Sequence, residues 1–417
     1  MQSGMIKTFL HLKGNPRICL WTEPLWGIPY NLYAPFVALY MLSLGLTTAE
    51  IGYVTSMSLL VQFVASVLSG PLADKLGRRR CTFIFDTIAW TIPTVLWALS
   101  QNYLWFVVAG LVNGLWRVTM NSWGLLLTEG SEDEIVMRCF SLTQLMGLLA
   151  AFFAPLSKLA VDAFGVVPTM RVLYWFAAVM MTLKFVILYR VGTETEMGLR
   201  RMEETKHQSV WQLIWGCKDV FFSMIREKRM ILTIGILSAF QVVSTLNTSF
   251  WAVYITKNLG VADGDVALYT TFKSLVLMAC IFLIVPRVRF KRFKRPMLVA
   301  WGLFALSQGV LLAARGGQYA VATLILSIAL EAVALSMLSP LTDSLLFVNA
   351  DPAERARILG LIYGLIVLVI TAVPALAGIL STISLAAPFI INLVVLAIGA
   401  ALTIALWRTL RQSDPDL

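Results

Sequence analysis

The chain has 417 residues, of which 59% are hydrophobic and only 13% are charged, and its mean hydropathy is +0.80. Soluble proteins carry roughly twice that charged fraction, so the composition excludes a soluble globular protein and predicts an all-α membrane protein with about twelve spans. The formal net charge of +10 fits cations in loops that face anionic lipid, so membrane lipids are the expected partner of this charge and nucleic acid is not.

Twelve apolar runs of spanning length follow one another along the chain. They cover residues 17–41, 50–72, 81–101, 103–128, 139–161, 168–190, 230–256, 265–286, 296–314, 318–347, 356–380 and 384–408. The polar segment 191–229 separates six spans from six, and residues 211–225 within it have the pattern of an amphipathic surface helix. We therefore predict an N-terminal six-helix bundle (1–190), a cytoplasmic linker (191–229) and a C-terminal six-helix bundle (230–417).

The distribution of Lys and Arg orients the spans. If both termini lie in the cytoplasm, most of the 33 cations fall in cytoplasmic segments, and only Arg171, Lys257 and Arg315 lie on the opposite side. Cytoplasmic loops are enriched in Lys and Arg, so the sequence predicts this orientation, in a cytoplasmic (inner) membrane. The five cysteines are scattered and lie mostly toward the cytoplasmic side, so no disulfides are expected.

The short loop between the second and third spans carries the most distinctive pattern in the chain. Residues 70–80 read GPLADKLGRRR, which resembles the signature loop of the major facilitator superfamily of transporters. The two halves of the chain also repeat, because residues 34–52 are similar to residues 249–267. Such a parallel repeat of six spans is typical of that superfamily.

The resemblance implies the fold of the superfamily, with two pseudo-symmetric six-helix bundles that rock about a central site lined by spans one, four, seven and ten. It also implies that the signature loop (residues 70–80) is a conformational latch. The residues expected to form the latch are Gly70, Asp74, Gly77, Arg78 and Arg79. Their partners would lie at the start of span eleven, near Arg355 and Arg357.

Patterns of catalytic chemistry are missing from the sequence. It contains no nucleotide-binding G-x-x-x-x-G-K-[ST] loop, no H-E-x-x-H and no G-x-S-x-G. The two histidines, His11 and His207, lie outside the predicted spans. We therefore expect no enzyme activity, no cofactor and no metal site.

Span one carries a polar and aromatic stripe at helical spacing. Glu23, Trp26, Tyr30 and Tyr33 follow one face, and Asn31 lies beside them. Trp26, Tyr30 and Asn31 are expected to line the central site. For Glu23 two interpretations stay open, because a carboxylate near the end of a span can mark the membrane interface or exchange protons.

Span four carries Asn113, Arg117, Asn121 and Gly124 on nearly one face. A charge halfway through a span is costly unless it is paired or hydrated. Arg117 and Asn121 are therefore expected to bind substrate, and a salt bridge within the bundle is the alternative for Arg117. The position of Arg117 does not match the arginine of the drug-antiporter motif, which would fall nearer residue 109.

Spans seven and ten complete the predicted site. Span seven presents Gln241, Ser244, Thr245, Thr248 and Trp251, with Asn247 adjacent. Span ten holds Glu331 near its middle and Asp343 nearer the cytoplasm. Of these, Gln241, Thr245, Asn247 and Glu331 are predicted to bind substrate, and Glu331, Glu23 and Asp343 are the candidates for proton coupling.

The charges inside the spans suggest specific pairs. By the internal repeat, Glu331 occupies nearly the place in its half that Arg117 occupies in the other, so we predict that the two approach each other. Lys273 in span eight is expected either to pair with an acid or to face the central site. Lys158 and Lys184 lie near span ends and are expected to snorkel to the membrane surface, and Asp86 is expected to join the charges of the signature loop.

These patterns together predict a secondary active transporter that moves a small organic solute by alternating access. The mixture of aromatic, amide and hydroxyl groups suits an amphipathic or partly aromatic solute. Import and export are not distinguished, protons are one candidate for the coupling ion, and a monomer suffices to enclose a pathway. The alternatives are a lipid flippase of the same fold and, further off, a receptor or scaffold that moves no solute.

Overall fold

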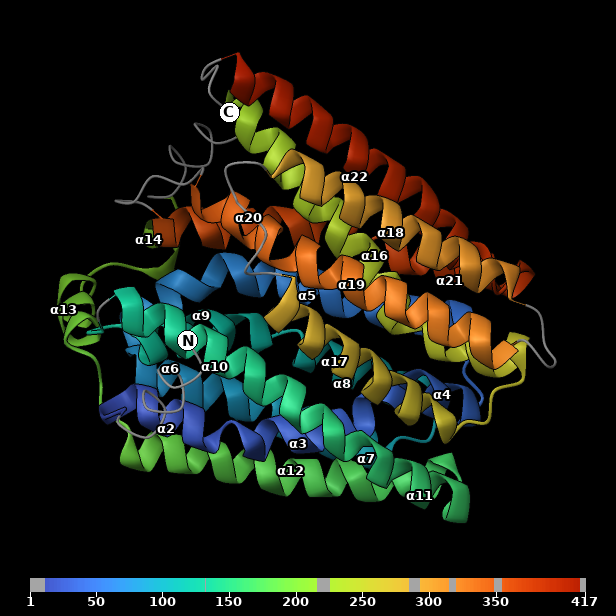
Figure 1. Ribbon diagram of the computed structural model, residues 1–417. Coiled ribbons are helices and arrows are strands. Elements are labelled where there is room, and N and C mark those ends of the chain that lie inside the picture. The colour runs from blue at the N-terminus through green and yellow to red at the C-terminus, as the bar shows by residue number, and fades with distance from the viewer. Residues whose placement is uncertain are drawn as a thin grey trace. The chain divides into compact units, whose positions relative to one another are not determined.

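The apolar segments of this chain can satisfy their backbone polar groups in a bilayer only by forming helices or closed barrels. The computed structural model describes residues 12–131, 133–215, 226–284, 293–314, 320–348 and 355–412, and every regular element within these ranges is a helix (Figure 1). The prediction of an all-α membrane protein is confirmed.

The helices before residue 216 are α2 (Gly14–Thr22), α3 (Pro24–Tyr33), η1 (Ala34–Phe36), α4 (Val37–Ser43), α5 (Thr48–Leu76), α6 (Arg78–Asp86), η2 (Thr87–Thr91), α7 (Ile92–Leu99), α8 (Tyr103–Asn113), α9 (Trp116–Thr128), α10 (Asp133–Ala150), η3 (Ala151–Phe153), α11 (Ala154–Phe164), α12 (Val166–Val191), α13 (Glu196–Glu204) and α14 (Val210–Trp215). Those that follow are α16 (Lys228–Leu259), α17 (Asp265–Leu283), α18 (Lys294–Ala313), α19 (Ala320–Val348), α20 (Arg355–Ile370), α21 (Val373–Ile383) and α22 (Ala387–Arg411).

Eleven segments of the described chain are long and apolar enough to cross a membrane, and they coincide in order with eleven of the twelve predicted spans. The remaining predicted span, 17–41, is covered in succession by α2, α3, η1 and α4. Pro24 begins α3, Pro29 lies inside it and Pro35 lies in η1. Because proline removes a backbone donor and crowds the preceding turn, this span consists of short helical pieces.

The chain divides into two compact units. Unit 1 comprises Met1–Ala34, Met57–Ser157 and Val167–Lys218, and unit 2 comprises Pro35–Ser56, Lys158–Val166 and Asp219–Leu417. The predicted boundaries at 190 and 230 are not tested by this division, and they stay a prediction.

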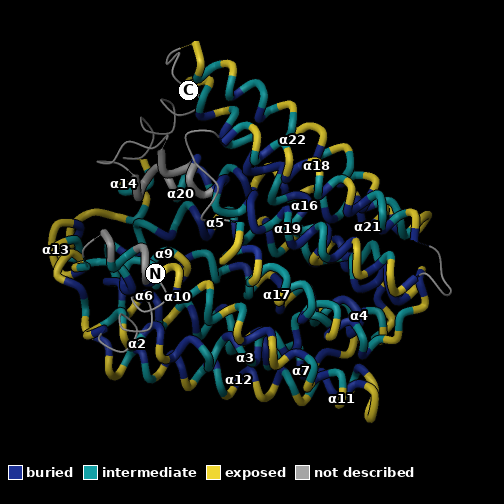
Figure 2. Tube along the Cα trace, in the orientation of Figure 1, coloured by how far each residue is buried: buried dark blue, intermediate teal, exposed yellow. Residues whose placement is uncertain are grey.

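The surfaces of the long helices indicate which side meets lipid. On α12, Val172, Val179 and Leu183 are exposed at helical spacing, whereas Tyr174 and Met181 are buried (Figure 2). On α22, the exposed residues Ile390, Val394 and Ile398 recur every four positions. In water such apolar stripes would be a liability, but in a bilayer they form the lipid-facing side of each helix.

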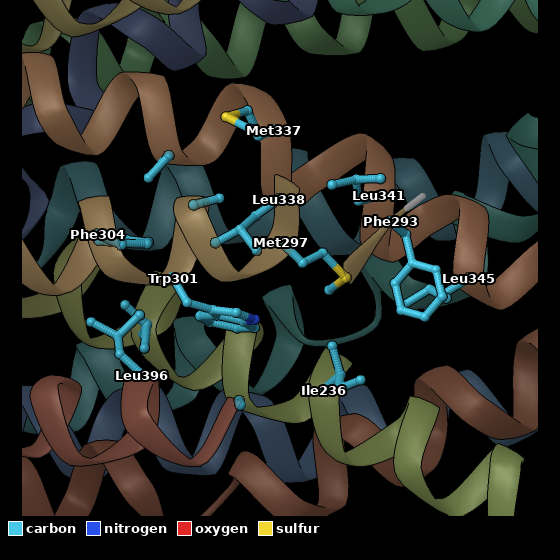
Figure 3. Close-up of a cluster of buried hydrophobic side chains, with 14 of the residues drawn as sticks. Ile236, Phe293, Met297, Trp301, Phe304, Met337, Leu338, Leu341, Leu345 and Leu396 are labelled. Atoms are coloured by element: carbon cyan, nitrogen blue, oxygen red, sulfur yellow. The ribbon is translucent and has the colours of Figure 1, made fainter. Parts of the chain in front are cut away.

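The largest buried side chain of unit 2 is Trp301 on α18, which is 1% exposed. Its ring packs against Gly399 of α22, where a Cβ atom would lie 2.8 Å from the ring, and its Nε1 donates to Thr403 Oγ1 at 3.1 Å. Met297 and Leu396 belong to the same apolar cluster (Figure 3). This cluster joins α16, α18, α19 and α22 into one packed body.

Two further contacts within unit 2 bring distant segments together. Gly52 and Gly378 pack backbone to backbone, because a Cβ atom at Gly378 would lie 3.1 Å from the Gly52 Cα. Lys158 Nζ bridges Asp162 at 2.6 Å and Asp265 at 2.7 Å. Lys158, which is expected to snorkel to the membrane surface, has two partly exposed carboxylates as partners.

Candidate functional site

The signature loop is built on Gly77, whose φ of +79° lies in a region that only glycine adopts readily. The turn lets α6 begin directly after α5, and it places Arg78 in a buried position, with its side chain 4% exposed. The Arg78 guanidinium donates to Asp74 of α5 at 2.9 Å and to Glu129, the residue directly after α9, at 3.0 Å. Arg78 therefore joins α5 to the end of α9.

The segment after α12 returns to this loop. One carboxylate, that of Glu194, accepts hydrogen bonds from the backbone N–H groups of Arg78 at 2.9 Å and of Arg79 at 3.0 Å. The Arg79 side chain donates to the Gly192 carbonyl at 3.0 Å. Lys75 donates to the Gln208 carbonyl at 2.6 Å. The beginning of the predicted linker is thus part of unit 1, bound to the signature loop.

The structure does not test the other contacts predicted for the latch. Gly70 has open space around it, and the side chains of Arg355 and Arg357 lie outside the described residues, as does that of Asp343. The pairing of the loop with the start of span eleven therefore stays a prediction.

Glu23 and Lys184 form a buried ion pair in unit 1. Their atoms Oε2 and Nζ are 2.7 Å apart, and the side chains are 11% and 6% exposed. Asp86 is also buried, and its charged neighbours are Lys184 and Glu23 rather than the arginines of the signature loop. The expectation that Lys184 snorkels was wrong, because the buried face of α12 carries it inward, where it balances two carboxylates.

An aromatic cluster lies next to this pair. The Trp26 ring stacks on Tyr30 at 4.8 Å, and Trp90 meets both rings edge-on, at 5.1 and 6.1 Å. Trp90 sits in the π-helical turn η2, and such turns occur frequently at functional sites. Lys184 Nζ lies 5.8 Å from the Trp26 ring centre. The structure thus joins the predicted Trp26 and Tyr30 to a charge pair.

The span-four stripe contacts α5. Arg117 Nε donates to Gln62 Oε1 at 3.3 Å, and its guanidinium lies 4.4 Å from the Trp116 ring centre. Asn121 donates to Ser69 Oγ at 3.4 Å. Asn31 bonds within its own helix, to the Gly27 carbonyl at 2.8 Å. The amide groups predicted to bind substrate in unit 1 therefore already have protein partners.

Unit 2 contains a chain of buried polar side chains around Glu331. Lys273 Nζ and Asn247 Nδ2 both donate to Glu331 Oε1, at 2.6 and 2.8 Å. Asn392 Nδ2 donates to Asn247 Oδ1 at 2.8 Å and to Gln308 Oε1 at 3.2 Å. Five helices, α16, α17, α18, α19 and α22, contribute one residue each.

The two faces of α16 differ. Asn247 is buried in the polar chain just described, whereas Gln241 and Thr245 are half-buried and Thr248 is exposed. The predicted pairing of Arg117 with Glu331 would join the two units and stays a prediction. Within its own unit, Glu331 has Lys273 as its charged partner.

Sequence reasoning missed Lys184, Trp90, Gln308 and Asn392 as members of these clusters. Gln308 and Asn392 are fully buried amides in apolar spans. A polar side chain in a membrane span is costly unless it is bonded, which was the signal available for both.

The comparisons with known proteins agree with these features. A family model described as Major Facilitator Superfamily matches residues 26–288, more than half of the chain. The chain belongs to the Major Facilitator Superfamily. It is therefore an integral multi-pass membrane protein of a transporter family, which predicts a small-molecule substrate.

Relatives within the superfamily are named for different functions. Quinolone resistance protein NorA of Staphylococcus aureus is 22% identical over 237 residues, which are 56% of this chain and 58% of NorA. The matched region thus spans less than two thirds of that relative. Glucose transporter GlcP of Staphylococcus epidermidis is 36% identical over 105 residues, 24% of this chain and 23% of GlcP.

Solved structures share the superfamily fold over almost the whole chain. The nucleoside transporter NupG aligns with a TM-score of 0.69 at 15% identity, covering 95% of this chain and 99% of NupG. A POT family transporter in complex with 5-aminolevulinic acid aligns with a TM-score of 0.70 at 15% identity, covering 94% of this chain and 95% of its own. At such identities the likeness shows the fold alone.

Proposed function

We propose that this superfamily member is a secondary active transporter that moves a small organic solute across the membrane by alternating access. The observation that carries the proposal is the presence, in each unit, of a charge pair held inside apolar spans: Glu23 with Lys184, and Glu331 with Lys273. Charged groups are expensive at that depth and occur mainly along solute or ion pathways.

The aromatic groups support an organic solute. Trp26, Tyr30 and Trp90 are half-buried and cluster within unit 1. Aromatic faces suit amphipathic or ring-bearing molecules, whereas an inorganic ion needs only a few oxygen ligands. Trp26, Tyr30, Asn31, Arg117 and Asn121 in unit 1 are proposed to bind it, and Gln241, Thr245, Asn247 and Glu331 in unit 2.

Protons are proposed as the coupling ion, with Glu331 as the leading acid and Glu23 and Asp343 as further candidates. Glu331 is buried in the middle of α19 and shares its carboxylate oxygen between two donors. A carboxylate in such a place can take up and release a proton in each cycle. We further propose that the protein works as a monomer in the cytoplasmic membrane with both termini in the cytoplasm.

The test begins with the purified protein in detergent. Sugars, amino acids, organic anions, nucleosides, lipids and cationic drugs are screened for a rise in melting temperature, since a ligand that binds the folded state stabilises it. The hit is then followed into proteoliposomes with and without a pH gradient.

Uptake that follows the gradient and falls in Arg117→Ala supports the proposal. A Glu331→Gln variant that accumulates the solute as well as the wild type along the gradient would refute the proton role. If labelled lipid crosses the bilayer and no solute does, the protein is a flippase.

A further inference from the structure

The two charges of the Lys273–Glu331 pair differ in their access to a ligand. The Lys273 side chain is 32% exposed, whereas that of Glu331 is 5% exposed. The carboxylate oxygen Glu331 Oε1 already accepts two hydrogen bonds. An incoming solute would therefore meet the positive member of the pair first.

The Lys273 ammonium also has unused donors. It carries three N–H groups, and among the described residues the structure gives it one hydrogen-bond acceptor, Glu331 Oε1 at 2.6 Å. Tyr269 lies one helical turn earlier on the same face of α17 and is half-buried. A lysine in the middle of a span is expected to face the interior of the bundle or a water-filled passage.

The polar chain fixes where the lysine points. Asn247 donates to Glu331, so its oxygen must accept, and Asn392 supplies that bond while it also donates to Gln308. Glu331, Asn247, Gln308 and Asn392 are all buried. The carboxylate is thus bonded to Asn247, which Asn392 and Gln308 hold in place, and it holds Lys273 in turn.

The cations of unit 1 are placed differently. Lys184 is 6% exposed and lies near two aromatic rings, Trp123 at 5.5 Å and Trp26 at 5.8 Å. Arg117 donates a hydrogen bond from Nε to Gln62, and its guanidinium lies over the Trp116 ring. Lys273, by contrast, is 32% exposed and has one acceptor among the described residues, which leaves room for a solute oxygen.

We propose that Lys273 is the group that binds an anionic oxygen of the solute, a carboxylate or a phosphate, and that Glu331 is its positioning residue. This inference rests on the proposed function, and it assigns the solute to the organic anions. When the anion binds, the single ammonium lies between two negative groups and balances one of them, and uptake of a proton by Glu331, the proposed coupling acid, would neutralise the other.

The experiment compares matched pairs of small molecules on the purified full-length protein. Benzoate is tested against benzamide, gluconate against sorbitol, and glucose 6-phosphate against glucose, with the melting temperature as the readout. The anionic member of at least one pair should stabilise the wild type more than its neutral partner. Its affinity should fall by roughly tenfold to a hundredfold in Lys273→Met, the loss expected for a charge-assisted hydrogen bond.

Three variants keep the result interpretable. Lys273→Arg retains the charge and should retain the preference for anions. The double variant K273M/E331Q removes both charges, so it avoids leaving an unpaired carboxylate, and it should fold yet lose the preference. Lys257→Met removes an exposed lysine of α16 in the same unit and should bind like the wild type.

Two results would overturn the inference. Neutral members that stabilise as well as the anions, with shifts unchanged in K273M/E331Q, would remove Lys273 from the site while leaving solute transport intact. Stabilisation by phosphatidylglycerol and by none of the soluble anions would assign the lysine to a lipid headgroup instead. Failure of the proposed function itself would be a different result, namely no solute movement in proteoliposomes by the wild type.

Discussion

Replacing Lys184 by methionine should destabilise the protein strongly. The Nζ atom lies 2.7 Å from Glu23 Oε2 in a pair whose side chains are 6% and 11% exposed. Asp86, also buried, has the same lysine as its charged neighbour. Methionine is similar in length and apolar, so the variant removes the charge with little change in packing and leaves two buried carboxylates without a cation.

The size of the effect follows from the burial. Removing one partner of a buried ion pair costs about 3–5 kcal/mol, because the remaining charge stays out of water. For a unit of this size that loss lowers the melting temperature by on the order of 10 °C. The double variant E23Q/K184M should recover part of the loss, since glutamine carries no charge.

A thiol-reactive fluorogenic dye can follow the unfolding of the protein in detergent. Four described cysteines, Cys19, Cys81, Cys139 and Cys280, are free and buried, and they become reactive when the helices separate. Lys13→Met, at an exposed lysine, is the control and should melt within about 2 °C of the wild type. If Lys184→Met melts with that control, the two carboxylates do not depend on the lysine, and the reasoning is refuted.

Three further substitutions test the packing. Gly378→Val should cost roughly 1–3 kcal/mol in the same melting assay, because a Cβ atom there would lie 2.6 Å from a backbone oxygen, whereas Gly124→Ala, with open space around it, should not destabilise. Glu194→Gln should cost about 1–3 kcal/mol, because the amide offers one acceptor oxygen and an NH2 group that cannot accept, so one of the two backbone donors at the start of α6 loses its partner. The exposed Glu203→Gln should be neutral; equal melting of the two would contradict the capping role. Trp301→Ala should cost about 3–5 kcal/mol, and a loss below about 1 kcal/mol would mean that the apolar cluster closes over the space.

The sequence located the spans well because a bilayer sets the length of an apolar helix. The eleven long helices follow the predicted runs, and even the broken first span coincides with a predicted one. Hydropathy indicates which segments lie within the bilayer, but it does not indicate which face of a helix is turned toward lipid and which toward the other helices.

The rotation of a helix about its axis determines whether a charged side chain near the end of a span is buried or reaches the membrane surface. Lys184 was assigned to the membrane surface from its place near the end of a span, yet Met181 and Phe185 beside it are buried, and the lysine shares their face. The exposed apolar residues of α12 mark its opposite side, so the helical pattern contained the information. The choice of Glu23 as partner depends on how α2, α3 and α12 pack, which one sequence does not specify.

Glu331 illustrates the same limit. Its depth in the span predicted a functional carboxylate, and the structure surrounds it with Lys273 and Asn247. The sequence left the partner of Lys273 open, because α17 and α19 are far apart in the chain and nothing local specifies their contact. Gln308 and Asn392 enter the same chain from two other helices.

The return of residues 192–208 to the signature loop has a consequence for dividing the chain into two polypeptides. A cut after Val191 would separate Glu194 from the backbone donors of Arg78 and Arg79, and Gln208 from Lys75. A cut just after Gln208 would keep those bonds within the first fragment. The cut for co-expressing the two halves therefore belongs well beyond the end of the sixth span, and the exposed polar turn at residues 206–209 is the place for it.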